Sequence, residues 1–224
     1  MIPAVKNLLK EIERRSSDIE DDKIVEIIDK VITDIKKLNK RVQHLNDVII
    51  ICCDISGSRI VNVRIQRDIK KIAENSTGLI SDLRSAKLGD HKSAIKFENS
   101  AVADRIEQEL NQLSTSIVGL WSQWKNQEFG SLAIFKQAFG QVKDLQKISS
   151  KIDRIRLQLR QFENPASNQE DGEKVKNLIF DKNGVQDMLV EAGVSQKISD
   201  FMISSSNENG SKLEIFDDDI KTWL

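Results

Sequence analysis

The chain has 224 residues, of which 31% are charged and only 5% are aromatic, with two Pro and no Tyr. Its formal net charge of −1 argues against a protein that binds nucleic acid over its whole surface, because such a domain is normally basic. The two Cys are adjacent and have no third partner, and no apolar run approaches the length of a membrane span. We therefore expect a cytoplasmic protein with no membrane segment.

A strict apolar repeat begins near the start of the chain. Apolar residues recur at alternating spacings of four and three, which is typical of a coiled-coil seam. The repeat predicts one long helix over residues 22–53, with a break at Gly57. We interpret its apolar stripe as a seam that binds a second helix, from another copy of the chain or from a partner protein. The seam residues are Ile24, Ile28, Val31, Ile35, Leu38, Val42, Leu45 and Ile49, and Cys52 continues the spacing.

Three further apolar repeats predict that most of residues 1–165 is helical. Residues 58–86 should run back along the first helix, and later repeats occupy residues 102–124 and 145–162. The last one should stop at Pro165, because the residue before a proline disfavours the helical conformation. The sequence thus predicts an all-α protein, in which long coiled-coil-like helices pack as an antiparallel bundle or as hairpins.

The character of the chain changes after Pro165. Residues 166–172 contain no large apolar side chain and predict a linker. Beyond them we expect a small, mostly helical module over residues 173–224, divided at Gly184 and Gly193, with a brief strand at 212–216. Lys and Arg exceed Asp and Glu by five over residues 1–165, whereas Asp and Glu exceed Lys and Arg by six over the rest. The C-terminal module is therefore expected to be acidic.

The last residues have the pattern that predicts the opening of an amphipathic helix. Asp217, Asp218 and Asp219 precede Ile220, Trp223 and Leu224, and acidic residues favour the N-terminal end of a helix. Either the tail docks Trp223 into a groove, or the helix continues in a longer natural chain. This ending is similar to that of uncharacterised helical proteins from bacterial defence operons. The similarity points to no named family and assigns no role to any residue.

Motifs for catalysis or for metal and cofactor binding are missing from the sequence. His44 and His91 have no second ligand at a metal-binding spacing, and neither a phosphate-binding glycine loop nor a Gly-x-Ser-x-Gly motif occurs. Cys52 and Cys53 suggest a redox role or a core position, and we favour the core because Cys behaves as a small buried hydrophobe. We expect no cofactor, no metal and no enzymatic activity.

Large aromatic residues gather in one part of the sequence. They invite interpretation as a ligand pocket, but we favour a core at the end of a bundle, since coiled-coil seams seldom accommodate Trp. An enzyme on a helical scaffold would place its ligand here or near His91. The aromatic residues are Trp121, Trp124, Phe129, Phe135 and Phe139.

Basic residues concentrate between residues 136 and 160, where seven Lys and Arg face only two acidic residues. Their spacing keeps many of them on one side of a helix, which suggests contact with nucleic-acid phosphates. Solvated helix faces have the same composition, so this interpretation is not favoured. The candidate contacts are Lys143, Lys147, Lys151 and Arg154, beside Lys136, Arg156 and Arg160, and a second group is Arg59, Arg64, Arg67, Lys70 and Lys71.

The uninterrupted seam of the first long helix carries the functional expectation. We expect a non-enzymatic helical scaffold or adaptor, which binds itself or a protein partner through coiled-coil pairing. The alternative is a nucleic-acid-binding accessory factor that uses the basic helix faces and belongs to a bacterial defence system.

Overall fold

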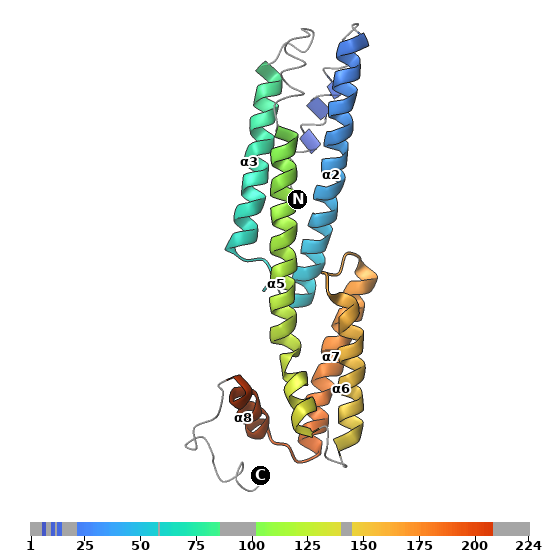
Figure 1. Ribbon diagram of the computed structural model, residues 1–224, viewed down its shortest axis with the longest axis vertical. Helices are drawn as coiled ribbons and strands as arrows, with labels where there is room; N and C mark the ends of the chain where they lie inside the picture. The colour runs from blue at the N-terminus through green and yellow to red at the C-terminus, as the bar shows by residue number, and fades with distance from the viewer. Residues whose placement is uncertain are drawn as a thin grey trace. The chain divides into compact units, whose positions relative to one another are not determined.

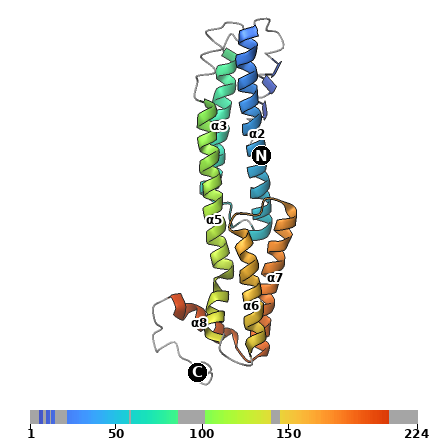
Figure 2. The same cartoon turned by 45° about the vertical axis from the view of Figure 1, so that its right-hand side comes forward.

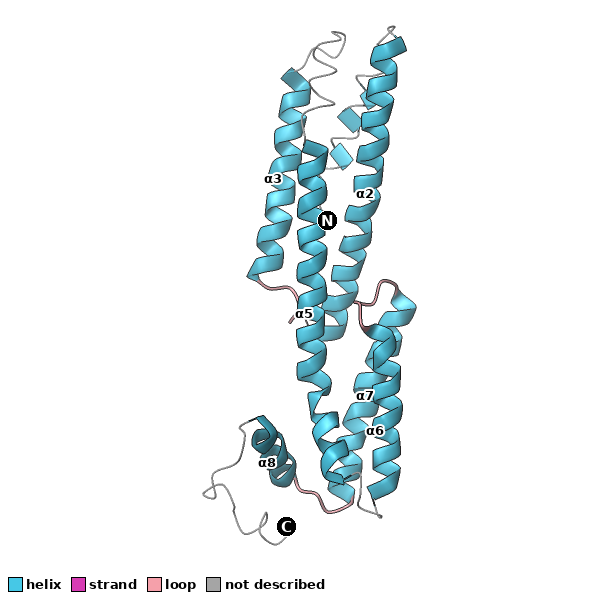
Figure 3. Cartoon of the chain, in the orientation of Figure 1, coloured by secondary structure: helices cyan, strands magenta, loops and turns pink. Residues whose placement is uncertain are grey.

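A computed structural model describes most of the chain. The described residues are 6, 7, 10, 11, 13, 14, 22–57, 59–85, 102–139 and 145–207. Within these, the side chains of residues 22–24, 79–85, 102–103, 138–139 and 202–207 are not described. Every regular element in the described part of the chain is a helix, as Figure 3 shows, so the predicted all-α fold is confirmed.

The described elements are six α-helices and one short 3-10 helix. They are α2 (Asp22–Ser56), α3 (Val63–Ser85), α5 (Val102–Phe139), α6 (Gln146–Leu159), η2 (Arg160–Phe162), α7 (Gln169–Glu191) and α8 (Gln196–Asn207). None of these helices is long and apolar enough to cross a membrane.

The chain forms two compact units, Met1–Leu120 and Trp121–Leu224. Their boundary lies inside α5, at the start of the aromatic cluster, and not at the linker expected after Pro165. α5 therefore contributes its first part to one unit and its second part to the other.

The first unit is a helical bundle made by α2, α3 and the first part of α5, which lie side by side in Figures 1 and 2. Arg41 on α2 donates hydrogen bonds to Glu107 and Asn111 on α5, at 3.0 and 2.6 Å. The turn between α2 and α3 contains Gly57 with a φ of 61°, a left-handed conformation that favours glycine. The predicted break at Gly57 is confirmed.

The second unit packs α6 against both α7 and the second part of α5. Trp121 is fully buried, and its indole N–H donates to the carbonyl oxygen of Phe162 at 3.0 Å. Lys151 on α6 pairs with Asp181 on α7 at 3.5 Å. α7 therefore belongs to the same packed unit as α6, in contrast to the separate module expected for residues 173–224.

The linker before α7 is shorter than predicted. The Asn168 side chain accepts a hydrogen bond from the backbone N–H of Asp171 at 2.9 Å and caps the helix, so residues 169–172 form its first turn. Gly184 lies inside α7, and the prediction that it divides two elements is wrong. Gly193 does end α7, with a φ of 86° and the two backbone hydrogen bonds of a Schellman motif.

Residues 208–224 lie outside the described part of the chain. The predicted strand at 212–216 and the predicted helix opening at Trp223 and Leu224 fall there.

Candidate functional site

The predicted partner-binding seam lies in the core of the first unit. Side chains at five of its eight positions are no more than 8% exposed within this single chain, and those of Val31 and Ile49 are half-buried. The side chain of Ile24 lies outside the described residues. In this conformation the chain's own helices cover the seam, so a partner helix cannot reach it without rearrangement. The five buried residues are Ile28, Ile35, Leu38, Val42 and Leu45.

The four predicted nucleic-acid contacts have different surroundings. Lys147 and Arg154 are exposed on α6, and neither has an ion pair among the described residues. Lys151 is half-buried and is occupied by Asp181 on α7. Lys143 lies outside the described part of the chain. Of the three described residues on the predicted face, Lys147 and Arg154 are available to bind a phosphate, and the charge of Lys151 is neutralised by Asp181.

The second basic concentration belongs to the first unit, around α3. Arg64, Arg67 and Lys71 are exposed, and Lys70 pairs with Glu74 at 3.7 Å. This group and the basic residues of α6 are thus parts of different units.

A stripe of exposed side chains runs along α6 and η2, and its members Arg154 and Gln161 also line a groove with α7. Its members follow spacings of three and four, the spacing that places residues in line for pairing with another helix. Leu157 follows Arg154 by three residues in this stripe and is 63% exposed, so the stripe presents a large apolar side chain beside a cation. We name this set the α6 outer stripe: Lys147, Ser150, Arg154, Leu157 and Gln161.

The opposite flank of α6 forms one wall of a pocket, and the second part of α5 forms the other wall. The pocket has a volume of about 320 Å³. Polar contacts join the two walls beyond both ends: Lys136 contacts Ser149 and Asp153, and Lys125 donates to the carbonyl oxygen of Phe162. Between them α5 presents the small residues Gly130 and Ala133 beside Phe129, and the walls stand apart there. The lining residues are Lys125, Asn126, Phe129, Gly130, Ala133, Arg156, Leu159, Arg160 and Glu163.

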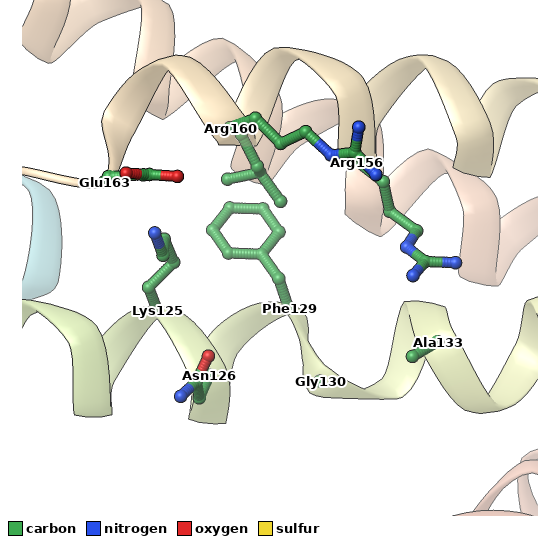
Figure 4. Close-up of a pocket in the computed structure, with 9 residues that line it drawn as sticks. Lys125, Asn126, Phe129, Gly130, Ala133, Arg156, Arg160 and Glu163 are labelled. Atoms are coloured by element: carbon green, nitrogen blue, oxygen red, sulfur yellow. The ribbon is translucent and has the colours of Figure 1, made fainter.

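The charges in the pocket are unevenly placed. In Figure 4 the guanidinium groups of Arg156 and Arg160 lie toward the Ala133 end, whereas Lys125 and Glu163 lie at the other end. The Phe129 ring points from α5 toward α6 between the two ends. Arg156 and Arg160 are both exposed, and no acidic partner is found for either among the described residues. One end of the pocket therefore carries two uncompensated positive charges.

The remaining aromatic residues belong to the core, as we had favoured. The side chains of Trp121 and Phe135 are fully buried, and Trp124 stacks near Trp121 with ring centroids 4.9 Å apart. The ring of Phe129 packs edge-on against Trp124 at 6.2 Å and is 6% exposed at the pocket. Phe139 has no described side chain. Within the aromatic cluster, Phe129 lines the pocket, and Trp121, Trp124 and Phe135 fill the core.

Cys52 and Cys53 are both free thiols, the first fully buried on α2 and the second half-buried. Burial, and secondarily the neighbouring Cys53, raises the pKa of Cys52 to about 12, and burial also raises the pKa of Cys53. Protonated thiols are poor nucleophiles and poor metal ligands. This supports the core interpretation of Cys52 over the redox one.

The described histidines and acidic residues are not grouped as a metal centre would require. His44 is exposed on α2, and His91 lies outside the described residues. No group of three or more His, Cys, Asp or Glu side chains is placed to hold a metal ion within the described ranges.

The sequence did not indicate two of the charged pocket residues, Lys125 and Glu163. Lys125, Phe129 and Ala133 lie four residues apart and so share a face of α5. Arg156 on α6 and Arg160 at the start of η2 have the same spacing. These spacings, and the small Gly130 next to Phe129, can be seen in the sequence. What the sequence could not supply was that these two faces, about thirty residues apart in the chain, face each other.

No protein-family model, no curated protein and no solved structure matches this chain.

Proposed function

We propose that this protein is a helical adaptor, which binds an acidic helix of a partner protein or of another copy of the chain through the α6 outer stripe. The proposal keeps the expectation of helix pairing and moves it from α2 to α6. The observation that carries it is the exposed Leu157, which follows the two unpaired cations Lys147 and Arg154 along the stripe.

The composition of the stripe favours a protein partner. An exposed apolar side chain gives little to phosphate contact, but it can anchor a helix whose acidic residues meet Lys147 and Arg154. Apolar contact at the centre and charge contact at the rim is the usual arrangement of a protein interface. Ser150 and Gln161 are small or neutral and permit close approach of a second helix.

The alternative is contact with nucleic acid through the same face of α6. Lys147 and Arg154 are available for phosphates, and Arg156 and Arg160 add positive charge on the flank that forms the pocket wall. A phosphate-driven complex would weaken steeply with added salt, because counterions are released on binding. Binding to DNA or RNA at low salt, with a slope that falls when Lys147 and Arg154 are reversed to Glu, would favour this alternative.

The test compares the parent chain with the double variant Arg154→Glu/Leu157→Asp. Both are used for light scattering over a dilution series and as bait in lysate of the source cell. Arg105→Glu is the control, since Arg105 is an exposed arginine on α5 in the first unit. We expect a dimer, or a captured protein, with the parent and with Arg105→Glu, and its loss with the double variant.

Two results would contradict the proposal. One is a parent chain that is strictly monomeric and retains no protein. The other is a complex that forms equally well with the double variant. Matching melting temperatures for the three proteins would show that the comparison concerns binding and not folding.

A further inference from the structure

The pocket between α5 and α6 lies outside the α6 outer stripe, and its chemistry goes beyond pairing with another helix. We propose that it is a binding site for a phosphomonoester carried on a small aromatic or apolar body. Arg156 and Arg160 bind the phosphate, and Phe129 and Leu159 contact the body.

The pocket brings together two like charges. Arg156 on α6 and Arg160 at the start of η2 are four residues apart along one continuous helical stretch, a spacing at which like charges repel. Neither has an acidic partner in the described part of the chain. A phosphomonoester carries close to two negative charges near neutral pH, which matches the two arginines at this end. Arginine is also the side chain that binds phosphate oxygens in a bidentate manner.

The volume of the pocket suits a small molecule. A volume of about 320 Å³ exceeds what a bare phosphate needs and lies at the lower end of the range for small-molecule sites. The space exists because α5 presents Gly130 and Ala133 to it, and no atom lies within 4 Å of where a Cβ on Gly130 would stand. A ligand body can therefore occupy the space that these small residues leave.

The two charged ends of the pocket are separated by an apolar surface. In Figure 4 the Phe129 ring separates the two arginines from Lys125 and Glu163. Phe129 and Leu159 offer an apolar surface for an aromatic body, and ring pairs gain contact beyond simple burial. Lys125 is held by the carbonyl oxygen of Phe162 at 3.1 Å, so it can supply charge at the far end without collapsing into the pocket.

Phenyl phosphate is the probe for the test, in calorimetric titrations of the full chain beside inorganic phosphate and phenol. We expect phenyl phosphate to bind with a dissociation constant of about 1 mM or lower, about tenfold more tightly than inorganic phosphate. Phenol should show no binding in the same range. Failure of phenyl phosphate to bind at concentrations of about 10 mM would overturn the proposal.

Variants locate the binding. Arg156→Gln and Arg160→Gln should each weaken phenyl phosphate by about tenfold, since each removes a charge-assisted contact. Ala133→Leu should abolish binding by filling the pocket while every charge is retained. Arg105→Gln on α5 in the first unit removes one exposed arginine elsewhere and should leave the affinity within about twofold.

Equal affinity in the parent, Arg156→Gln and Ala133→Leu would contradict the site, because it would mean diffuse attraction to positive charge. Melting curves establish that each variant is folded. The test is independent of the proposed function, because Arg156, Arg160 and Ala133 are not members of the α6 outer stripe.

A final arm separates two sources of the same chemistry. A peptide that carries phosphotyrosine is titrated against its unphosphorylated form. If it binds more tightly than phenyl phosphate, the natural ligand is a phosphorylated side chain of a protein. If it binds more weakly than phenyl phosphate and phenyl phosphate still depends on Arg156 and Arg160, the natural ligand is a free small molecule.

Discussion

Ser116 on α5 donates a hydrogen bond to the Oδ2 atom of Asp68 on α3 at 3.1 Å, inside the core of the first unit. Asp68 is only 3% exposed, although the neighbouring Ile69 continues the apolar repeat and is half-buried. The other carboxylate oxygen of Asp68 has no hydrogen-bond partner among the described residues. The bundle therefore buries a carboxylate with a single partner, which is costly unless it is compensated.

A second polar contact lies two helical turns away. Asn75 on α3 donates to Glu109 on α5, so the two pairs are separated by seven residues along both helices. The residue numbers rise along α3 and fall along α5, so the two helices are antiparallel. The contacts also fix the register, because a shift of one helix by a single residue would break both of them. A buried pair such as Ser116–Asp68, with the half-buried Asn75–Glu109 pair beside it, can select one alignment of helices at some cost in stability.

Ser116→Ala should lower the free energy of unfolding by about 1–3 kcal/mol, because it leaves the buried Asp68 carboxylate without its partner. Asp68→Asn should cost less or even stabilise the fold, since it removes the buried charge and keeps an acceptor for Ser116. Urea unfolding of the two single variants and the double variant measures the coupling between them. A Ser116→Ala variant as stable as the parent would mean that the contact does not contribute.

The sequence predicted the helices of the first unit but not every residue in its core. Apolar periodicity predicted α2 and α3 and the break at Gly57, because burial of a stripe requires a helix in that phase. It did not predict that Asp68 is buried, since a charged residue is not part of an apolar repeat. Nor did it predict that the seam is covered from within, because a 3.5-residue repeat is the same whether the covering helix belongs to this chain or to another.

Ile35→Asp should lower the free energy of unfolding by more than about 3 kcal/mol, because it removes a buried side chain and desolvates a charge. Ile35 is 3% exposed in the core of the first unit. Lys40→Asp is the matched control on the exposed side of α2, with an expected change of about 0.5 kcal/mol or less. Lys36 is less suitable, since it pairs with Glu13 at 3.2 Å. Thermal melts of both variants provide the comparison, and equal melting temperatures would contradict the assigned core.

Two glycines with open space around them should respond to alanine in opposite directions. Gly119 lies on the exposed side of α5, so Gly119→Ala should stabilise the fold by about 0.5–1 kcal/mol through helix propensity. Gly57 has a φ of 61°, so Gly57→Ala should destabilise it by about 1–2 kcal/mol through backbone strain. Chemical denaturation of both variants gives the sign, and the same sign for both would contradict the assigned backbone conformations.

The raised pKa of Cys52 predicts a pH dependence above neutrality. The folded chain holds this proton up to about pH 12, whereas the unfolded chain releases it near pH 9. The thiol's contribution to the free energy of unfolding is therefore fully present below about pH 9 and is lost between about pH 9 and 12. Stability should then fall as the pH rises, by at most about 1.4 kcal/mol per pH unit between 9 and 12.

Cys52→Val should remove this contribution while keeping the core filled. The difference in unfolding free energy between parent and variant, followed from pH 8 to pH 11, isolates the thiol from the lysines that titrate in the same range. A difference that stays constant with pH would contradict the assigned environment of Cys52.

The second unit shows a different limit of prediction. The repeat over residues 145–162 predicted α6 and its stop before Pro165, but residues 166–172 were expected to form a linker because they lack large apolar side chains. The Asn168 cap and the acidic first turn that follows it were present in the sequence and begin α7 three residues before that predicted linker ends. The pocket required knowledge of which face of α5 meets α6, and a single helix repeat does not contain it.

If the α6 outer stripe, and not the seam of α2, is the surface available to a partner, its side chains should be accessible to reagents in the free protein. Alkylation rates of two single-cysteine variants, Leu157→Cys and Ile35→Cys, test this in a background with Cys52→Val and Cys53→Ser. We predict that Leu157→Cys reacts at least about a hundredfold faster in the dilute purified protein, and that lysate of the source cell slows it. Fast labelling of Ile35→Cys that the lysate protects, with no protection of Leu157→Cys, would contradict the account.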